Sequence, residues 1–170
     1  MKILAIRLKN LASLAGPFEI DFTAEPLASA GLFAITGPTG AGKSTLLDAL
    51  CLALFGAVPR LGDTGQAKMP DADSDISIGD PRTLIRRGTG GGYAEVDFVG
   101  VNGRRYRARW EANRARDKAS GKLQNSRQSL IDLDSDQLLA SQKTEYKTQL
   151  ELALGCLLYT SDAADERSSV

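Results

Sequence analysis

Residues 37–44 read GPTGAGKS and match the phosphate-binding pattern G-x-x-x-x-G-K-[ST]. The run GLFAIT at residues 31–36 is short and apolar, which predicts a buried parallel strand. Residues 45–55 (TLLDALCLALF) contain no Pro or Gly and predict a helix. A strand, a glycine-rich loop and a helix in this order are the context in which the pattern binds a nucleotide. The alternative is a glycine turn before an ordinary helix, although four fixed positions match by chance in only about one chain of this size in a hundred.

The residue types in this loop suit a polyphosphate. Glycine permits positive φ and a close approach of the backbone to a ligand, and successive N–H groups at a helix N-terminus form a cradle for an anion. Lys43 offers an ammonium group to the β- and γ-phosphates, and the Ser44 hydroxyl is a hard oxygen ligand for Mg²⁺. We therefore expect a bound nucleotide and Mg²⁺, with Ser44 as the metal ligand.

The composition narrows the remaining chemistry. The chain has 170 residues, enough for one domain with a core, and its 21 basic residues balance 21 acidic ones. It contains no histidine, which excludes His-based acid–base catalysis and most zinc sites. Cys51 and Cys156 have no metal-binding spacing, and Cys51 is expected to pack as a small apolar side chain. Because no signal peptide or membrane span is visible in the sequence, we expect a cytoplasmic protein.

Outside the loop, the pattern predicts more strands than helices. Alternating apolar and polar side chains predict strands at residues 3–9, 18–22, 93–99, 104–110 and 129–133. The Asn102–Gly103 pair is a turn signal that joins two of them into a hairpin. Apolar residues four apart predict an amphipathic helix over residues 143–154. A loop of about 25 residues follows Gly56, and loops of that length are usually functional or mobile.

Several of these segments resemble the N-terminus of the SbcC family, the ATPase subunits of the SbcCD nuclease, which are related to the SMC-like DNA-repair ATPases. The resemblance extends to about residue 155 and rests on residues 1–11, 20–22, 31–43, 48–54, 59–61, 106–108 and 113–116. It implies an α/β fold: the N-terminal lobe of a P-loop NTPase head of the ABC/SMC type, with a flanking antiparallel β-meander.

The same resemblance implies a function and partners. In this family, two ends of a chain separated by a coiled coil form one head, and two heads sandwich ATP to control a nuclease. It thus implies an ATPase of DNA repair and recombination, with ATP and Mg²⁺ as cofactors. Carried over by position, the residues that it implies for binding Mg²⁺ and ATP are Gly37, Pro38, Thr39, Gly40, Ala41, Gly42, Lys43, Ser44 and Thr45. The implied partners are an SbcD-like nuclease subunit, a second SbcC-like head that forms a homodimer through ATP, and double-stranded DNA ends. The matched part holds no glutamine loop, signature motif or Walker B strand, so we expect no catalytic residue and no ATP hydrolysis by this chain alone.

Two features depart from the family pattern. Several relatives carry an Arg shortly after the first strand that reaches the nucleotide, and the nearest position here is Ala12; residues 84–88 fall where relatives approach the base. Residues 156–170 break the pattern abruptly and read like a translated sequencing adapter. We therefore expect the ATPase lobe at residues 1–155 and a non-native tail at residues 156–170.

A basic hairpin leaves two interpretations open. Residues 82–127 hold twelve Lys and Arg against four Asp and Glu, whereas residues 63–80 hold five Asp against one Lys. Arg105, Arg107 and Arg109 share one face of a strand, an arrangement suited to DNA phosphates. The alternative is a solvated hairpin whose basic face meets acidic neighbours such as the Asp-rich loop.

Other functions remain possible for a P-loop chain. A small kinase would have a parallel α/β fold, whereas this chain opens and continues with antiparallel-type strands. A transporter ATPase usually places an aromatic residue before the loop, and the N-terminus here has no obvious one. An inert truncated fragment, which binds nothing tightly, is the third alternative.

Overall fold

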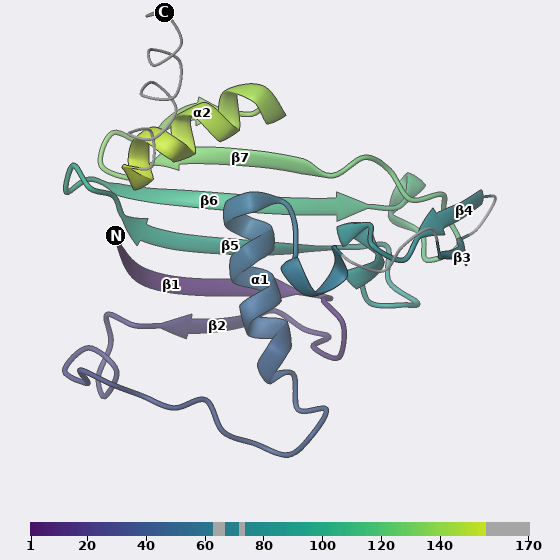
Figure 1. Ribbon diagram of the computed structural model, residues 1–170, viewed down its shortest axis with the longest axis horizontal. Coiled ribbons are helices and arrows are strands. Elements are labelled where there is room, and N and C mark those ends of the chain that lie inside the picture. The colour runs from purple at the N-terminus through teal and green to yellow at the C-terminus, as the bar shows by residue number, and fades with distance from the viewer. Residues whose placement is uncertain (63–66, 72–73, 156–170) are drawn as a thin grey trace, which may run out of the picture.

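The computed structural model describes residues 1–62, 67–71 and 74–155 (Figure 1). The expected non-native tail at residues 156–170 lies outside this part, as does a section of the Asp-rich loop. The large sheet consists of β1 (Lys2–Lys9), β2 (Phe18–Asp21), β5 (Gly91–Val99), β6 (Arg105–Asn113), β7 (Arg127–Asp132) and β8 (Gln137–Ala140). The strand order is β2-β1-β5-β6-β7-β8, and every neighbouring pair is antiparallel.

The sequence pattern located most of this sheet. The strands predicted at residues 3–9, 18–22, 93–99, 104–110 and 129–133 are confirmed as β1, β2, β5, β6 and β7. The predicted turn is also present: Gly103 has φ of 78° and the Asn102 side chain accepts a hydrogen bond from the Arg104 amide at 3.1 Å. The four-residue edge strand β8 was not predicted, because so short a segment carries little alternation.

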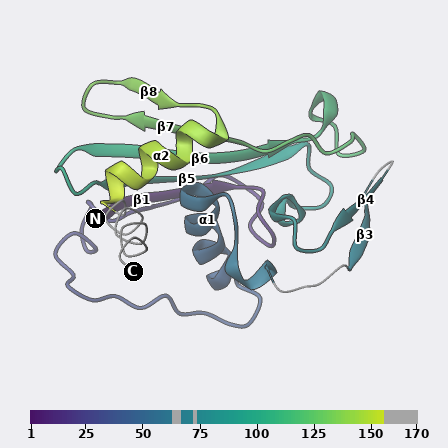
Figure 2. The same ribbon diagram turned by 45° about the horizontal axis from the view of Figure 1, so that its top comes forward.

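Two helices cover one face of the sheet. Helix α1 (Lys43–Phe55) packs on β1, β5 and β6, and α2 (Lys143–Leu154) packs on β7 and β8. The views in Figures 1 and 2 place both helices on the same side. The Tyr146 hydroxyl of α2 donates to the Ala53 carbonyl of α1 at 2.5 Å. Between the helices and the sheet lie fully buried side chains, among them Leu8, Leu52, Val96, Phe98, Trp110 and Leu130. Both helices were predicted, α1 from its run of helix-forming residues and α2 from apolar residues four apart.

The segment after α1 is more ordered than its length suggested. It contains a 3₁₀ turn at Pro59–Leu61, a hairpin of β3 (Lys68–Asp71) and β4 (Ser74–Ser77), and a second 3₁₀ turn at Pro81–Leu84. A third 3₁₀ turn, Ala115–Asp117, follows β6. The hairpin projects from the end of the sheet where β5 begins (Figure 1).

The strand predicted at residues 31–36 is wrong. This segment has no regular secondary structure, and Leu32, Phe33 and Ile35 are 92%, 46% and 45% exposed. A parallel strand is held by backbone hydrogen bonds to a neighbour, and no strand of the described part lies beside these residues. The Phe33 ring instead packs against Phe22, with ring centroids 5.2 Å apart.

Core truncation tests this arrangement. Leu8 is fully buried beneath α1, so Leu8→Ala should lower the free energy of unfolding by about 2–5 kcal/mol. Leu138→Ala removes the same atoms from a side chain that is 57% exposed and should cost less than about 0.5 kcal/mol. Urea unfolding followed by circular dichroism measures both, and equal losses would contradict the assigned core.

Candidate nucleotide-binding site

The glycine-rich loop leads directly into the N-terminus of α1. Gly42 is the N-cap residue, with φ of 92°, and no side chain caps the helix. The first intrahelical bond runs from the Leu46 amide to the Gly42 carbonyl at 3.3 Å. The amides of the first helical turn therefore have no carbonyl acceptor within the helix. They form the partly positive helix end that attracts an anion.

Lys43 folds back over the loop. Its Nζ donates to the Gly37 carbonyl at 2.7 Å and to the Pro38 carbonyl at 2.8 Å. These two carbonyls lie six and five residues before the lysine, so the backbone curls around the ammonium group. Gly40, with φ of 83°, lies in the turn that closes this curve. The ammonium group is thus already located within the loop, in a position from which it can exchange carbonyl oxygens for phosphate oxygens.

The other predicted binding residues lie around this curve. Gly37, Pro38, Thr39, Gly40 and Ala41 are exposed, as is Ser44 in the first turn of α1. Thr45 differs, because only 6% of it is exposed.

The exposed Ser44 hydroxyl at the helix N-terminus fits a Mg²⁺ ion that is also bound to phosphate. The described residues contain no group of three Asp, Glu, Cys or His side chains that could hold a metal ion by itself.

The start of α1 packs against the turn after β1, a contact that the sequence did not predict. The residues after β1 form a tight turn in which Asn10 and Ala12 have φ of 53° and 46°. Leu14 of this turn packs under the helix start: a Cβ added to Gly42 would lie 2.8 Å from the Leu14 Cδ2. Arg86 holds the turn from the other side, with hydrogen bonds to the carbonyls of Ala12 and Ser13 at 3.1 and 2.8 Å.

Because Arg86 bonds to the turn that packs against Gly42, residues 84–88 lie near the phosphate loop. The guanidinium group of Arg86 reaches the backbone at Ala12, the residue singled out in the sequence as a departure from the family pattern. The sequence offered no signal for the contact, because the two segments are 74 residues apart.

An ion pair between Asp48 and Arg60 joins the first half of α1 to the 3₁₀ turn that follows the helix. Asp48 is 4% exposed and receives two hydrogen bonds from Arg60, at 2.7 Å from Nε and 2.5 Å from Nη2. The adjacent Cys51 packs against the core, as expected, and burial together with the Asp48 charge raises the pKa of its thiol.

The outer face of the sheet carries rows of alternating charge. Arg7, Arg107 and Arg109 lie on this face, opposite the helices, and surround two carboxylates of β5. Asp97 is 6% exposed and receives hydrogen bonds from Arg7 at 2.8 Å and from Arg107 at 2.7 Å. Glu95 is 8% exposed and pairs with Arg109 at 3.0 Å.

The pKa of Asp97 reflects these contacts. Burial alone would raise it, but the hydrogen bonds from Arg107 and Arg7 outweigh burial and hold the pKa below its ordinary value. The carboxylate therefore stays charged and keeps both guanidinium groups on the sheet.

These contacts favour the second interpretation of the basic hairpin, a basic face that meets acidic neighbours. The arginines of β6 meet acidic neighbours, as the solvated alternative predicted, but the neighbours are chiefly carboxylates of β5. Arg105 pairs with Asp134 at 2.7 Å. One contact with the Asp-rich loop is present, between Arg114 and Asp71 at 2.6 Å.

The comparisons with known proteins agree with this geometry. A family model described as "AAA domain" matches residues 5–157, so the chain belongs to that family of P-loop ATPase domains. It is 68% identical to the SbcC subunit of nuclease SbcCD from Pseudomonas aeruginosa and 53% identical to the subunit of the same name from Rhodobacter capsulatus. Each match covers 91% of this chain and 13% of the relative. A "Probable DNA double-strand break repair Rad50 ATPase" of Aquifex aeolicus is 44% identical over 36% of the chain and 6% of the relative.

The expected SbcC resemblance and the P-loop NTPase fold are thereby confirmed. The chain spans only 13% of the length of the first two relatives.

Substitution of Gly42 tests the helix start. Gly42→Ala should lower the free energy of unfolding by at least about 1 kcal/mol, because alanine is strained at φ of 92° and its Cβ would collide with Leu14. Gly31→Ala is the control, since nothing lies within 4 Å of the added Cβ and its φ is not in the left-handed region. Urea unfolding compares the two variants, and a neutral Gly42→Ala would contradict the described cap.

The pH dependence of stability in an Asp97 variant tests the ion pairs on the outer face of the sheet. A carboxylate whose folded pKa is depressed stabilises the protein above its unfolded pKa of about 3.9, and that stability disappears as pH falls towards the folded pKa. Asp97→Asn should therefore lower stability at pH 7 and flatten its decline below about pH 5. Asp136→Asn, at an exposed side chain that makes no ion pair in the described part, should leave the curve unchanged. Urea unfolding between pH 7 and 3 provides the comparison.

Proposed function

We propose that this chain is the N-terminal ATP-binding lobe of an SbcC-like subunit, which uses ATP binding and hydrolysis to control a nuclease acting on DNA double-strand ends. The observation that supports this most directly is the position of the Lys43 ammonium group, held by two carbonyls of a curled glycine loop at an uncapped helix N-terminus. We assign the lobe to residues 1–155 and residues 156–170 to a non-native tail.

The chemistry follows from the loop. The amides of the loop and of the first turn of α1 bind the β- and γ-phosphates, and Lys43 moves from the carbonyls of Gly37 and Pro38 to phosphate oxygens. Ser44 ligates Mg²⁺, which neutralises phosphate charge when bound. Thr45 takes part through its backbone, since its side chain is buried.

Hydrolysis requires groups beyond this loop. A carboxylate near the metal and a residue that orients water are needed. Asp48, on the helix that follows the loop, is paired with Arg60 and is not free for that role. The proposal therefore assigns nucleotide binding to this lobe, and assigns hydrolysis to the assembled head of the longer protein.

The proposed partners are an SbcD-like nuclease subunit, a second head of the same kind joined through ATP, and double-stranded DNA ends. The names of the relatives support the first, and the second and third rest on the family resemblance. The proposed location is the cytoplasm; among the described residues, no helix is long and apolar enough to cross a membrane. The antiparallel sheet argues against a small P-loop kinase, whose sheet would be parallel.

Substitution of Lys43 tests the proposal. In a full-length protein that carries this sequence, Lys43→Ala should weaken binding of a fluorescent ATP analogue by at least about tenfold, because one charge-assisted contact with phosphate is lost. Lys143→Ala removes an exposed lysine at the start of α2 and should leave affinity unchanged. Fluorescence anisotropy with and without Mg²⁺ also tests Ser44→Ala, which should reduce the Mg²⁺-dependent part. Equal affinity of Lys43→Ala and the parent protein would refute the assignment of Lys43, and absence of ATP-analogue binding by the parent protein would favour an inert fragment.

A further inference from the structure

Positive charge without partners gathers at one end of the large sheet. Neighbouring strands are antiparallel, so the end of β1, the start of β5, the end of β6 and the start of β7 all lie together, beside the β3–β4 hairpin (Figure 1). We call this region the basic end, after six exposed residues found there: Lys9, Arg87, Arg116, Lys118, Lys122 and Arg127. Three of them lie in loops, Arg116 lies in a 3₁₀ turn and two lie at strand ends, which is why sequence alternation did not group them.

The six side chains differ from the arginines of the outer face in one respect. None of them forms a hydrogen bond, ion pair or ring contact with any residue of the described ranges. In contrast, Arg7, Arg107 and Arg109 are bonded to buried carboxylates. A guanidinium group that already neutralises a carboxylate gains little by turning to a phosphate, whereas a solvated cation gains the full counterion release. Of the described carboxylates near this end, those of Asp75 and Asp117 are unpaired.

The loop that carries three of these cations is held firmly. The Ala115 amide donates to the Lys122 carbonyl at 2.9 Å, and the Gln124 amide donates to the Asn113 carbonyl at 2.9 Å. Arg114 spans the loop, with a hydrogen bond to the Gly121 carbonyl at 3.0 Å and an ion pair with Asp71 at 2.6 Å. Arg116, Lys118 and Lys122 therefore project from a fixed backbone, which lowers the entropy lost on binding.

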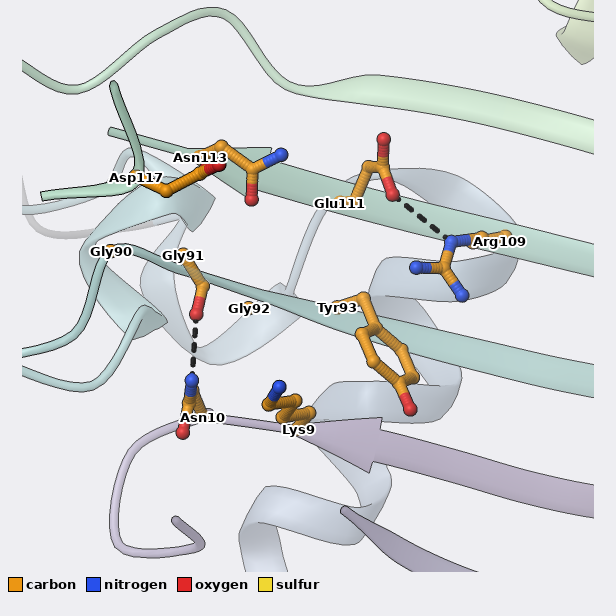
Figure 3. A pocket seen from close by; sticks show the side chains of 10 residues that line it. All are labelled: Lys9, Asn10, Gly90, Gly91, Gly92, Tyr93, Arg109, Glu111, Asn113 and Asp117. Carbon is orange, nitrogen blue, oxygen red and sulfur yellow. Dashed lines mark hydrogen bonds and ion pairs between the residues drawn. The ribbon is translucent and has the colours of Figure 1, made fainter. Parts of the chain in front are cut away.

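Polar hollows lie between the cations. One, of about 420 Å³, is lined by Lys9, Asn10 and Asn113 together with the carboxylates of Glu111 and Asp117 (Figure 3). The Asn10 amide donates to the Gly91 carbonyl at 2.9 Å, which leaves Lys9 and Asn113 as its available donors. Figure 3 shows Lys9 and Asn10 at the end of β1, with Asn113 across the bare backbone of the Gly90–Gly92 segment. A second, of about 280 Å³, is lined by Arg127 with Gln124, Asn125 and Ser126, and also by Glu111, whose charge Arg109 neutralises. Amide and hydroxyl groups beside cations are common ligands of nucleic-acid phosphates.

Exposed apolar surface is limited at the basic end as far as it is described. Phe18, which pairs with Leu8 at the end of β1, is 42% exposed, and a hollow of about 580 Å³ beside Arg87 has Met69 and Ile76 in its lining. The other large exposed apolar side chains lie elsewhere: Met1, Leu32, Phe33, Ile35, Leu47, Phe55, Val101, Leu138 and Leu152. A protein partner would need apolar or aromatic anchors at the centre of its interface. A polyanion backbone needs only cations and hydrogen-bond donors.

From these observations we propose that the basic end, rather than the arginine face of β6, contacts the phosphate backbone of double-stranded DNA. The proposal rests on the proposed function and locates its DNA contact. The contact lies near the nucleotide loop, because Arg86, next to Arg87, holds the turn that packs against Gly42.

The test is the salt dependence of DNA binding. In a full-length protein that carries this sequence, Arg116→Gln, Lys118→Gln and Lys122→Gln are combined, and binding of a fluorescent duplex is measured by anisotropy over a salt series from about 50 to about 300 mM. Each phosphate contact contributes about 0.9 to the slope of log K against log salt, so the combined variant should lose about 2–3 units of slope.

The matched control removes the same charge elsewhere. Lys2→Gln, Lys143→Gln and Lys147→Gln lie at the other end of β1 and on α2, and this variant should keep the parental slope. Exchange of each loop cation for the other basic residue (Arg116→Lys, Lys118→Arg and Lys122→Arg) should also keep it. An unchanged slope in the Gln variant, an equal loss in the lysine control, or a loss in the charge-conserving variant would each overturn the proposal.

Two further measurements distinguish DNA from an acidic protein partner and separate this proposal from the proposed function. Binding of the ATP analogue should be unaffected in all three variants. If the parent protein itself does not bind the analogue, that result counts against the proposed function and not against the DNA contact. Labelled poly-glutamate serves as an acidic protein mimic. If the Gln variant loses binding to poly-glutamate and keeps its DNA slope, the basic end is a protein-docking surface and the DNA proposal is wrong.

Discussion

The packing of α1 on the inner face of the antiparallel sheet is the contact on which the rest depends. The buried side of α1, which includes Ala49, Leu52 and Ala53, packs against apolar side chains of β1, β5 and β6. This packing fixes where the helix begins, and therefore where its unpaired amides point. The loop before it only has to curve, and the glycines permit the curve. The turn after β1 supports it through Leu14.

The outer face of the same strands is stabilised by ion pairs, whereas the inner face is stabilised by apolar packing. Buried carboxylates on β5 would be costly alone, but each lies between guanidinium groups of neighbouring strands. The arginines that look most suited to DNA in the sequence are consequently occupied. The unoccupied cations lie in loops and strand ends at one end of the sheet, where no carboxylate of the described part neutralises them. Charge counts along the sequence cannot separate these two groups, because pairing is a property of strand register.

The sequence predicted the main elements because their signals are local. Alternation identified five strands, and a pattern of apolar residues four apart identified α2. The short strands β3, β4 and β8 carry too few residues to show a period. The apolar run at residues 31–36 misled the prediction, because a strand also needs a partner, and hydrophobicity says nothing about where that partner lies.

The sequence by itself determined the phosphate loop: glycines at 37, 40 and 42, a lysine and a serine before a helix specify that chemistry through backbone freedom and side-chain type alone. It also determined the resemblance to SbcC. Only the tertiary structure decided what surrounds the loop. The contacts of Leu14 and Arg86 join segments far apart in the chain, and the neutralised arginine face arises from the register of β1, β5 and β6. Such long-range pairings depend on how strands align across the whole sheet, which no local pattern encodes.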